Sequence, residues 1–249
     1  MAEIKKNIEI LSLVYKSIDY LNFIADQFKS DLVKLEGWDV GVRLVANDAT
    51  PKVLEALKHC GVPYTVFNNP DPSEYYINRV YRAYNFCVES TTYDNVCLLN
   101  SDNVMSKDWL KNVLRYHNGI NIPCSRFIES GKMPSGRHAV NLGNNHFGRK
   151  PDEFDYVKWN QYAEMIKINE AHLGGIYGAC VFEKERFLEA GGYPEGNLYF
   201  DGVGTVNGHP IKSSDDYFFH DVLEAKYGMQ HVTVFDSIVY HIIEGEKDA

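Results

Sequence analysis

The stretch VCLLNSDN, residues 96–103, is an apolar run that ends abruptly in amide, hydroxyl and carboxylate groups. Such a run predicts a buried strand, and its polar end predicts the rim of a ligand site. A hard divalent cation takes one or two carboxylates besides phosphate oxygens, so Asp102 is suited to hold Mg²⁺ or Mn²⁺. The alternative interpretation is an ordinary turn, because Asn, Ser and Asp are frequent in turns.

Outward from this stretch, the first half of the chain alternates apolar runs with segments of helical period. Strands are predicted at Ile8 to Tyr15, Val40 to Ala46, Tyr64 to Phe67 and Asn95 to Leu99, with helices at 18–35, at Pro51 to His59 and from Ser73. This alternation predicts an α/β fold, a mostly parallel doubly wound sheet whose ligands bind beyond the carboxyl ends of the strands. No GxGxxG or GxxxxGK[ST] motif follows the first strand, so neither a dinucleotide site nor a P-loop is indicated.

The second half is less regular. Residues 128–160 are expected to form a long loop, followed by a strand at Ile176 to Phe182, a helix at Lys184 to Ala190, a flexible loop at 194–213, a helix from near Ser214 and a strand at His231 to Tyr240. With 249 residues, 45% of them hydrophobic, one domain is the default. We expect residues 1–104 to form its nucleotide-binding half and residues 105–249 its acceptor-binding half, with a smaller antiparallel element there.

Charge and composition narrow the class of protein. The net charge of −9 argues against non-specific nucleic-acid binding, although the segment 126–150 is locally basic through Arg126, Lys132, Arg137, Arg149 and Lys150. No apolar run is long enough for a membrane span and no signal core is apparent, so a soluble, cytoplasmic protein is expected. The five cysteines form no CxxC pair, which predicts reduced core residues and no thiolate zinc site.

Two further signals come late in the chain. Asp215 and Asp216 open the predicted helix in SSDDYF, residues 213–218, and a carboxylate there could act as a general base. The competing interpretation is structural, because acids in a first helical turn are favoured by the macrodipole and by capping. His241 directly follows the last strand, where it could complete an Asp-bound metal site or simply be an exposed or core residue.

Taken in order, these motifs resemble those of the family 2 glycosyltransferases, which have the single-domain GT-A fold. The resemblance covers about residues 8 to 241 and is carried by VRLVANDAT (42–50), LLNSD (98–102), HLGG (172–175), GGYP (191–194), the acid pair and His241. Asn47 and Asn100 stand where that family has acids. Asn47 can still bond a base edge, because an amide both donates and accepts.

The resemblance implies an inverting, metal-dependent transfer of a sugar from a nucleoside diphosphate, with UDP the expected carrier, to a hydroxyl acceptor. Mn²⁺ or Mg²⁺ would be held by Asp102 and His241, and Asp216 would be the base, with Asp215 beside it. Asp48 would contact the nucleobase, and Arg82 or the segment from Arg137 to Lys150 the phosphates or the acceptor. The implied donor-binding residues are Tyr15, Asn47, Asp48, Asn78, Arg82, Asn100, Ser101 and Asp102.

Three alternatives remain open from the sequence. A sugar nucleotidyltransferase has a similar sheet, but the loop beginning Lys16-Ser17-Ile18-Asp19 lacks the glycines such an enzyme needs for a triphosphate. A catalytically silent module that binds sugar nucleotides or glycans would explain the two Asn replacements. An enzyme with a phosphate-rich polymer as acceptor, including modified nucleic acid, would explain the basic segment.

Overall fold

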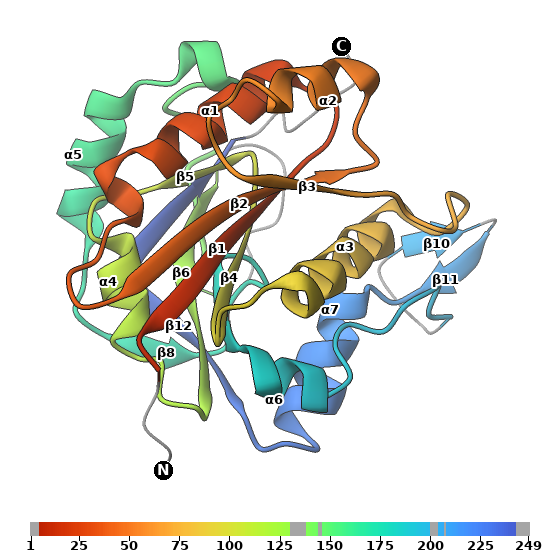
Figure 1. The fold of residues 1–249 in the computed structure, drawn as a ribbon. Coiled ribbons are helices and arrows are strands. Elements are labelled where there is room, and N and C mark those ends of the chain that lie inside the picture. Colours follow the sequence, from red (N-terminus) through yellow and green to blue (C-terminus); the bar gives the residue numbers. More distant parts are fainter. Residues whose placement is uncertain (1–4, 130–137, 144–145, 200–203, 207, 243–249) are drawn as a thin grey trace.

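A computed structural model of the protein describes residues 5–129, 138–143, 146–199, 204–206 and 208–242 (Figure 1). The strands are β1 (Asn7–Val14), β2 (Asp39–Asn47), β3 (Tyr64–Phe67), β4 (Asn95–Asn100), β5 (Asn103–Met105), β6 (Asn121–Glu129), β7 (Val140–Asn141), β8 (Ala171–Leu173), β9 (Cys180–Glu183), β10 (Gly204–Val206), β11 (His209–Ile211) and β12 (Gln230–His241). The α-helices are α1 (Ile18–Lys29), α2 (Pro51–Leu57), α3 (Tyr76–Ser90), α4 (Trp109–Leu114), α5 (Tyr156–Ile166), α6 (Lys184–Glu189) and α7 (Ser214–Tyr217). Short 3₁₀ turns lie at Asp31–Val33 and Pro151–Glu153, and a π-helical segment, Phe218–Glu224, continues α7.

The central sheet has the order β3-β2-β1-β4-β9-β6-β12-β5, with β7 beside β6 and β8 beside β12. The strands β3, β2, β1 and β4 are mutually parallel, as expected for a nucleotide-binding half. Beyond β4 the sheet is mixed, because β9 runs antiparallel to both β4 and β6, and β12 is parallel to β6 but antiparallel to β5. The predicted α/β fold with an antiparallel element in its second half is therefore confirmed.

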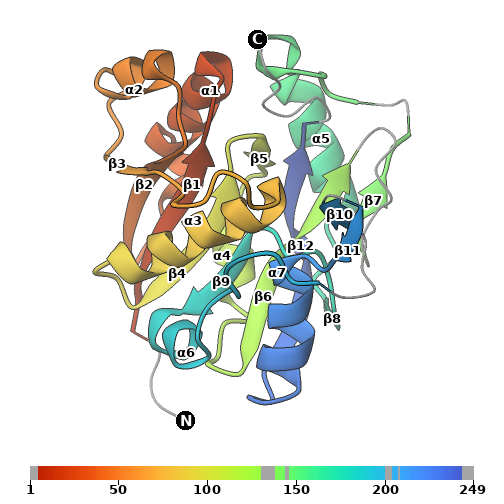
Figure 2. The same ribbon diagram turned by 90° about the vertical axis from the view of Figure 1, so that its right-hand side faces the viewer.

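Helices cover both faces of the sheet, as the two views show (Figures 1 and 2). Alternate residues of β1 divide between them: Ile10 packs with the core under α1, α2 and α4, whereas Leu11 packs with the core under α3, α6 and the π-helical segment. Both faces of this strand are buried, which is typical of a parallel strand, and its polar residues Glu9 and Ser12 are buried as well. A third cluster, around Trp159 and Tyr240, lies beneath α5.

The early helix starts follow from their caps. The Ser17 hydroxyl accepts from the Tyr20 amide, and Thr50 accepts from the Val53 amide with a proline at the first helical position. The predicted start at Ser73 is wrong: its hydroxyl bonds to Asp71 within a turn, and α3 begins only at Tyr76.

The predictions for the second half need four corrections, the first being that the loop expected at 194–213 contains the antiparallel strands β10 and β11. The expected loop at 128–160 is interrupted by β7 and by α5, whose start is capped by Asp155 and whose Trp159 is fully buried. The strand expected from Ile176 begins only at Cys180. The sequence interpretation also assigned no element to residues 105–127, which hold α4 and most of β6.

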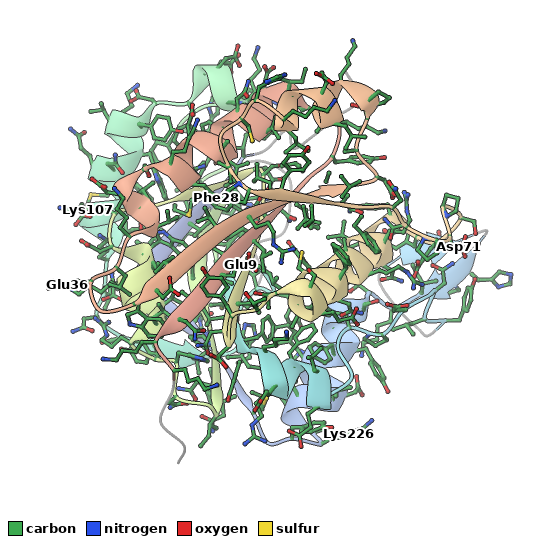
Figure 3. All side chains as sticks on the ribbon, viewed as in Figure 1. Glu9, Phe28, Glu36, Asp71, Lys107 and Lys226 are labelled. Carbon is green, nitrogen blue, oxygen red and sulfur yellow. The ribbon has the colours of Figure 1, made fainter. Side chains whose placement is uncertain are left out.

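A buried ion pair links two neighbouring parallel strands, β1 and β2. Glu9 on β1 accepts two hydrogen bonds of 2.9 Å from the Arg43 guanidinium on β2. Figure 3 shows Glu9 within the molecule, whereas the labelled Glu36, Lys107 and Lys226 lie at its periphery.

Among the helices of the described ranges, none combines the length and the apolar content that crossing a bilayer requires.

Candidate functional site

The carboxyl end of β2 carries a compact polar network. Asp48 accepts hydrogen bonds from the Asn69 amide at 2.8 Å and from the Arg79 guanidinium at 3.2 Å, and Asn47 accepts one of 2.8 Å from the Asn69 side chain. Asp48 has a φ of 50°, a left-handed conformation that Asp tolerates better than most residues. The network holds the Asp48 carboxylate, which stays about a quarter exposed, at the rim of the sheet.

The carboxyl end of β4 meets the end of β12. The β12–β5 pairing places His241 opposite Asn103, and the β12–β6 pairing places it opposite Glu129. His241 Nε2 lies 3.2 Å from Asp102 Oδ2, and its Nδ1 lies 3.6 Å from Glu129 Oε1. Two carboxylates and one imidazole, from the turn after β4 and from the ends of β6 and β12, therefore converge, although they are far apart in the sequence.

The electrostatics of this cluster suit a divalent cation. Burial lowers the pKa of His241, but the carboxylates of Asp102 and Glu129 outweigh that effect and raise it to about 10. Glu129 Oε2 is buried and has no hydrogen-bond partner among the residues that the structure describes. An excess of negative charge with an unsatisfied carboxylate oxygen fits Mn²⁺ or Mg²⁺ bound by Asp102 and His241, with Glu129 directly behind them.

The other residues of the β4 end are oriented by their neighbours. Asn100 Oδ1 accepts a hydrogen bond of 2.7 Å from the Tyr84 hydroxyl on α3, and the Asn100 amide donates to the Asn103 side chain. Asn103 in turn donates to Asp102 Oδ1 at 3.1 Å. Ser101, between them, is buried.

The two adjacent acids of α7 have different surroundings. Asp215 is buried and accepts hydrogen bonds from the Tyr81 hydroxyl and from the Asp216 amide. Burial and the nearby charge of Asp215 raise the pKa of Tyr81, so this phenol remains a donor. Asp215 therefore anchors the helix and is not free to take a proton from a substrate.

Asp216 faces outward, with 41% of its side chain exposed. One of its oxygens accepts a hydrogen bond of 3.0 Å from the Tyr177 hydroxyl, and the other pairs with Lys212 at 3.1 Å. The Tyr177 hydroxyl also lies 2.8 Å from His220 Nε2. A carboxylate held in this way has the exposure and the fixed orientation that a general base requires.

Helix α3 links the two groups. Tyr81 and Tyr84 lie one helical turn apart with their ring centroids 5.9 Å from each other, one bonded to Asp215 and the other to Asn100. Asp102 is also close enough to raise the pKa of Tyr84, after burial and Cys87. Asn100 and Asp215 therefore contact neighbouring tyrosines on the same side of α3.

Two of the expected donor-binding residues are already engaged. The Asn78 side chain, fully buried, accepts from Ser214 and donates to the Gly196 carbonyl, so it positions the start of α7. Arg82 pairs with Glu74 and Glu195. Tyr15 is partly buried beside the Lys16 ammonium, which lies 4.7 Å from the centre of its ring.

The basic segment provides less free charge than its sequence suggests. Arg126 stacks on Phe235 at 4.4 Å, and Lys150 pairs with Asp152 at 3.1 Å. Lys132 and Arg137 lie outside the described residues.

Sequence reasoning missed three residues of the site: Arg79, Glu129 and Tyr177. Arg79 could have been found, because it lies one residue after Asn78 on a helix already predicted. Glu129 and Tyr177 carried no local signal, because each is defined only by its partner on another element.

This fold is the GT-A fold of nucleotide-sugar transferases. Over 98% of its length the chain is similar to a structure of GalNAc-T7 with UDP, GalNAc and Mn²⁺, with a TM-score of 0.56 and 14% identity. Over the same share it is similar to a mannosyltransferase of Pyrobaculum calidifontis in complex with GDP-Man and Mn²⁺, with a TM-score of 0.55 and 12% identity. The chain spans 45% and 59% of the lengths of these two proteins. No protein-family model and no curated protein matches the sequence.

Proposed function

We propose that the protein is an inverting glycosyltransferase that moves a sugar from a nucleoside diphosphate, with UDP the preferred carrier, to a hydroxyl acceptor. The observation that carries this proposal is a GT-A fold that holds a carboxylate–histidine cluster at the end of β4 and an oriented, exposed carboxylate on α7. Both GT-A proteins above were solved with a sugar or nucleotide sugar and Mn²⁺.

On the donor side, Asp48 and Asn47 would bind the nucleobase, with Asn69 and Arg79 holding them in place. Asp102 and His241 would hold Mn²⁺ or Mg²⁺, and Glu129 would orient the histidine. The bound cation would neutralise the diphosphate as the leaving group gains charge. Residues 1–104 supply most of this half of the site, and residues 105–249 supply the rest, together with the acceptor side.

On the acceptor side, Asp216 would remove the proton of the acceptor hydroxyl while that oxygen attacks the anomeric carbon and the nucleoside diphosphate departs. Tyr177 and Lys212 hold the carboxylate for this attack. Tyr177 and His220 also line a cavity of about 670 Å³, so we place the acceptor on that side of Asp216. A general base of this kind contributes about 10² to 10⁴ in rate.

The experiment is a comparison of donor binding and of transfer or donor hydrolysis, for a panel of nucleoside diphosphates and their sugars, with and without Mn²⁺. We expect Asp216→Asn to lose about 10² to 10⁴ in turnover while it binds donor normally. We expect Asp102→Ala to lose the metal-dependent part of donor binding. Asp152→Ala, which removes an exposed acid that pairs with Lys150, is the matched control and should behave as wild type.

Two results would contradict the proposal. Wild-type turnover by Asp216→Asn would show that another group is the base. Donor binding without any turnover under every condition would favour the silent sugar-nucleotide-binding module, which the Asn residues at positions 47 and 100 keep in consideration.

A further inference from the structure

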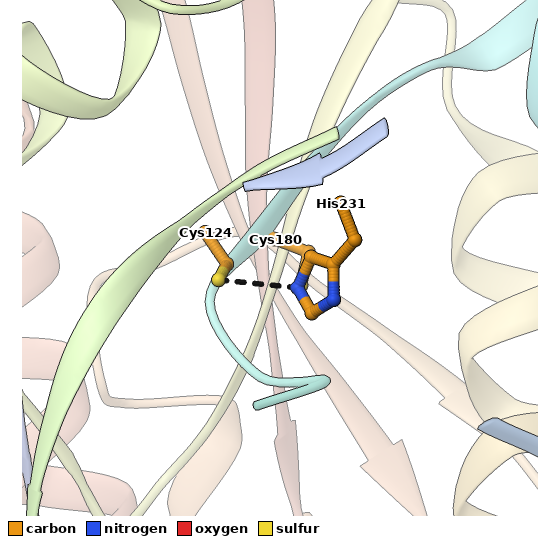
Figure 4. Close-up of side chains that lie close together, drawn as sticks. All are labelled: Cys124, Cys180 and His231. Carbon is orange, nitrogen blue, oxygen red and sulfur yellow. Dashed lines mark hydrogen bonds between the residues drawn. The ribbon is translucent and has the colours of Figure 1, made fainter. Parts of the chain in front are cut away.

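Three adjacent strands bring Cys180 of β9, Cys124 of β6 and His231 of β12 together (Figure 4). His231 and His241 lie near opposite ends of β12, so this group is separate from the cluster around Asp102. All three residues are buried. The spacing of the cysteines gave no sign of this group, because strand pairing and not sequence proximity gathers the three residues.

The register explains the grouping. Cys124 and Cys180 are directly paired across β6 and β9, and Cys124 is paired on its other side with Thr233 of β12, two residues beyond His231. Residues two apart on a strand point to the same face, so both thiols and the imidazole share one side of the sheet. This is the face that packs against α3, α6 and the π-helical segment.

The distances are those of a set of metal ligands before an ion is bound. His231 Nε2 lies 3.2 Å from Cys124 Sγ, and the three ligand atoms lie within 4.8 Å of one another. Around tetrahedral zinc, with bonds of about 2.0 to 2.3 Å, ligand atoms are roughly 3.3 to 3.8 Å apart. Small side-chain rotations would close the remaining difference.

The backbone at Gly175 passes so close to the cluster that no larger residue fits at this position. A Cβ on Gly175 would lie 2.9 Å from Cys124 Sγ and 2.2 Å from Thr233 Oγ1. Gly175 and His231 both line the 670 Å³ cavity next to Asp216. The backbone at Gly175 therefore covers the cluster on one side. On the side of His231, a ligand could reach the cluster from the cavity.

We propose that Cys124, Cys180 and His231 form a binding site for Zn²⁺, with a fourth ligand that comes from the cavity. Two thiolates balance the charge of one zinc ion, which makes the complete site neutral in a buried setting. The ligand set also separates this site from the cluster of Asp102, Glu129 and His241. Thiolates select zinc, whereas carboxylate oxygens suit Mg²⁺ and Mn²⁺.

The test uses the full chain, reduced and stripped of metal with a chelator, and titrated with Co²⁺ as a spectroscopic probe for zinc. We expect one equivalent to produce thiolate-to-Co²⁺ charge transfer and the strong visible bands of a tetrahedral site, and Zn²⁺ to displace it. Cys124→Ser, Cys180→Ser and His231→Gln should lose or greatly weaken these bands. Cys87→Ser, which changes a buried cysteine of α3 outside the cluster, is the matched control and should keep them. Asp102→Ala should keep them too, because it alters only the oxygen-rich cluster.

A measurement on the wild type covers the case in which the cysteine variants do not fold. With Zn²⁺ bound, Cys124 and Cys180 should resist alkylation in the folded protein and should become reactive after chelation, as mapped by peptide mass. Absence of the charge-transfer bands in the reduced wild type would overturn the proposal. It would equally be overturned if the bands survived in Cys124→Ser and Cys180→Ser, or if the two cysteines were found as a disulfide that takes up no Co²⁺ after reduction. None of these outcomes depends on glycosyl transfer.

Discussion

His117 should make the protein sensitive to mild acid. The ring follows α4 and is buried, and its Nε2 lies 2.7 Å from Asn95 Oδ1. The Asn95 amide nitrogen is used on the Lys5 and Asn7 carbonyls, so its oxygen must accept and Nε2 must carry the hydrogen. His117 Nδ1 is buried and makes no well-formed hydrogen bond within the described residues, and the nearby Asn121 backbone offsets only part of the effect of burial on the pKa. The imidazole is therefore built into the fold in its neutral form.

The magnitude follows from the difference in pKa between the folded and unfolded states. Burial lowers the pKa of His117 from 6.5 to about 4. Between these values the unfolded chain binds a proton that the folded chain does not, so the free energy of unfolding falls as the pH drops below about 6.5. The loss reaches about 2 kcal/mol at pH 5 and levels off near about 3 kcal/mol below pH 4. At pH 7 and above the effect is absent.

Urea unfolding at pH 7 and pH 5, followed by tryptophan fluorescence, measures this loss. His117→Gln retains an N–H donor for Asn95 but cannot titrate, so it should lose about 2 kcal/mol less than wild type between the two pH values. His59→Gln, at a histidine with a largely exposed side chain, is the matched control and should follow wild type. If His117→Gln and wild type lost equal stability between pH 7 and pH 5, the buried neutral histidine would not be the cause.

Three further predictions concern the carboxylates. Asp215→Asn should lower the free energy of unfolding by about 1.5 to 3 kcal/mol, because buried hydrogen bonds to a charged group are lost; unchanged urea unfolding would contradict its anchoring role. Glu9→Gln should lower the free energy of unfolding by about 3 to 5 kcal/mol, because it leaves the Arg43 charge buried without its partner. Adding Arg43→Met should recover part of this loss. A loss under roughly 1 kcal/mol would mean that the pair behaves like a surface ion pair. Asp48→Asn, which suits the same left-handed backbone, should raise the Kd for UDP about tenfold in calorimetry, and an unchanged Kd would remove Asp48 from the base-binding site.

The sequence by itself determined the parallel half of the fold. Four strands and the helices between them could be predicted, because each has a local pattern of apolar residues and helix caps. Strand pairing then adds the order of these strands in the sheet. The predicted proximity of Asp102 and His241 is also found, and the convergence of Asp48 and Asp216 with them stays a prediction. Polar residues that directly follow a predicted strand can be assigned to a site from the sequence, because the carboxyl ends of parallel strands meet at one edge of the sheet.

Only the tertiary structure decided which of these side chains are free to act. Asp215 and Asp216 are neighbours of identical chemistry, and burial against Tyr81 separates the anchor from the exposed carboxylate. Arg79 and not Arg82 reaches Asp48, because Glu74 and Glu195 occupy the latter. The cysteine–histidine cluster depends on the register of three strands drawn from distant parts of the chain, and no local pattern encodes such a register. Strand pairing and burial are non-local, and they decided which groups meet and which remain available to a ligand.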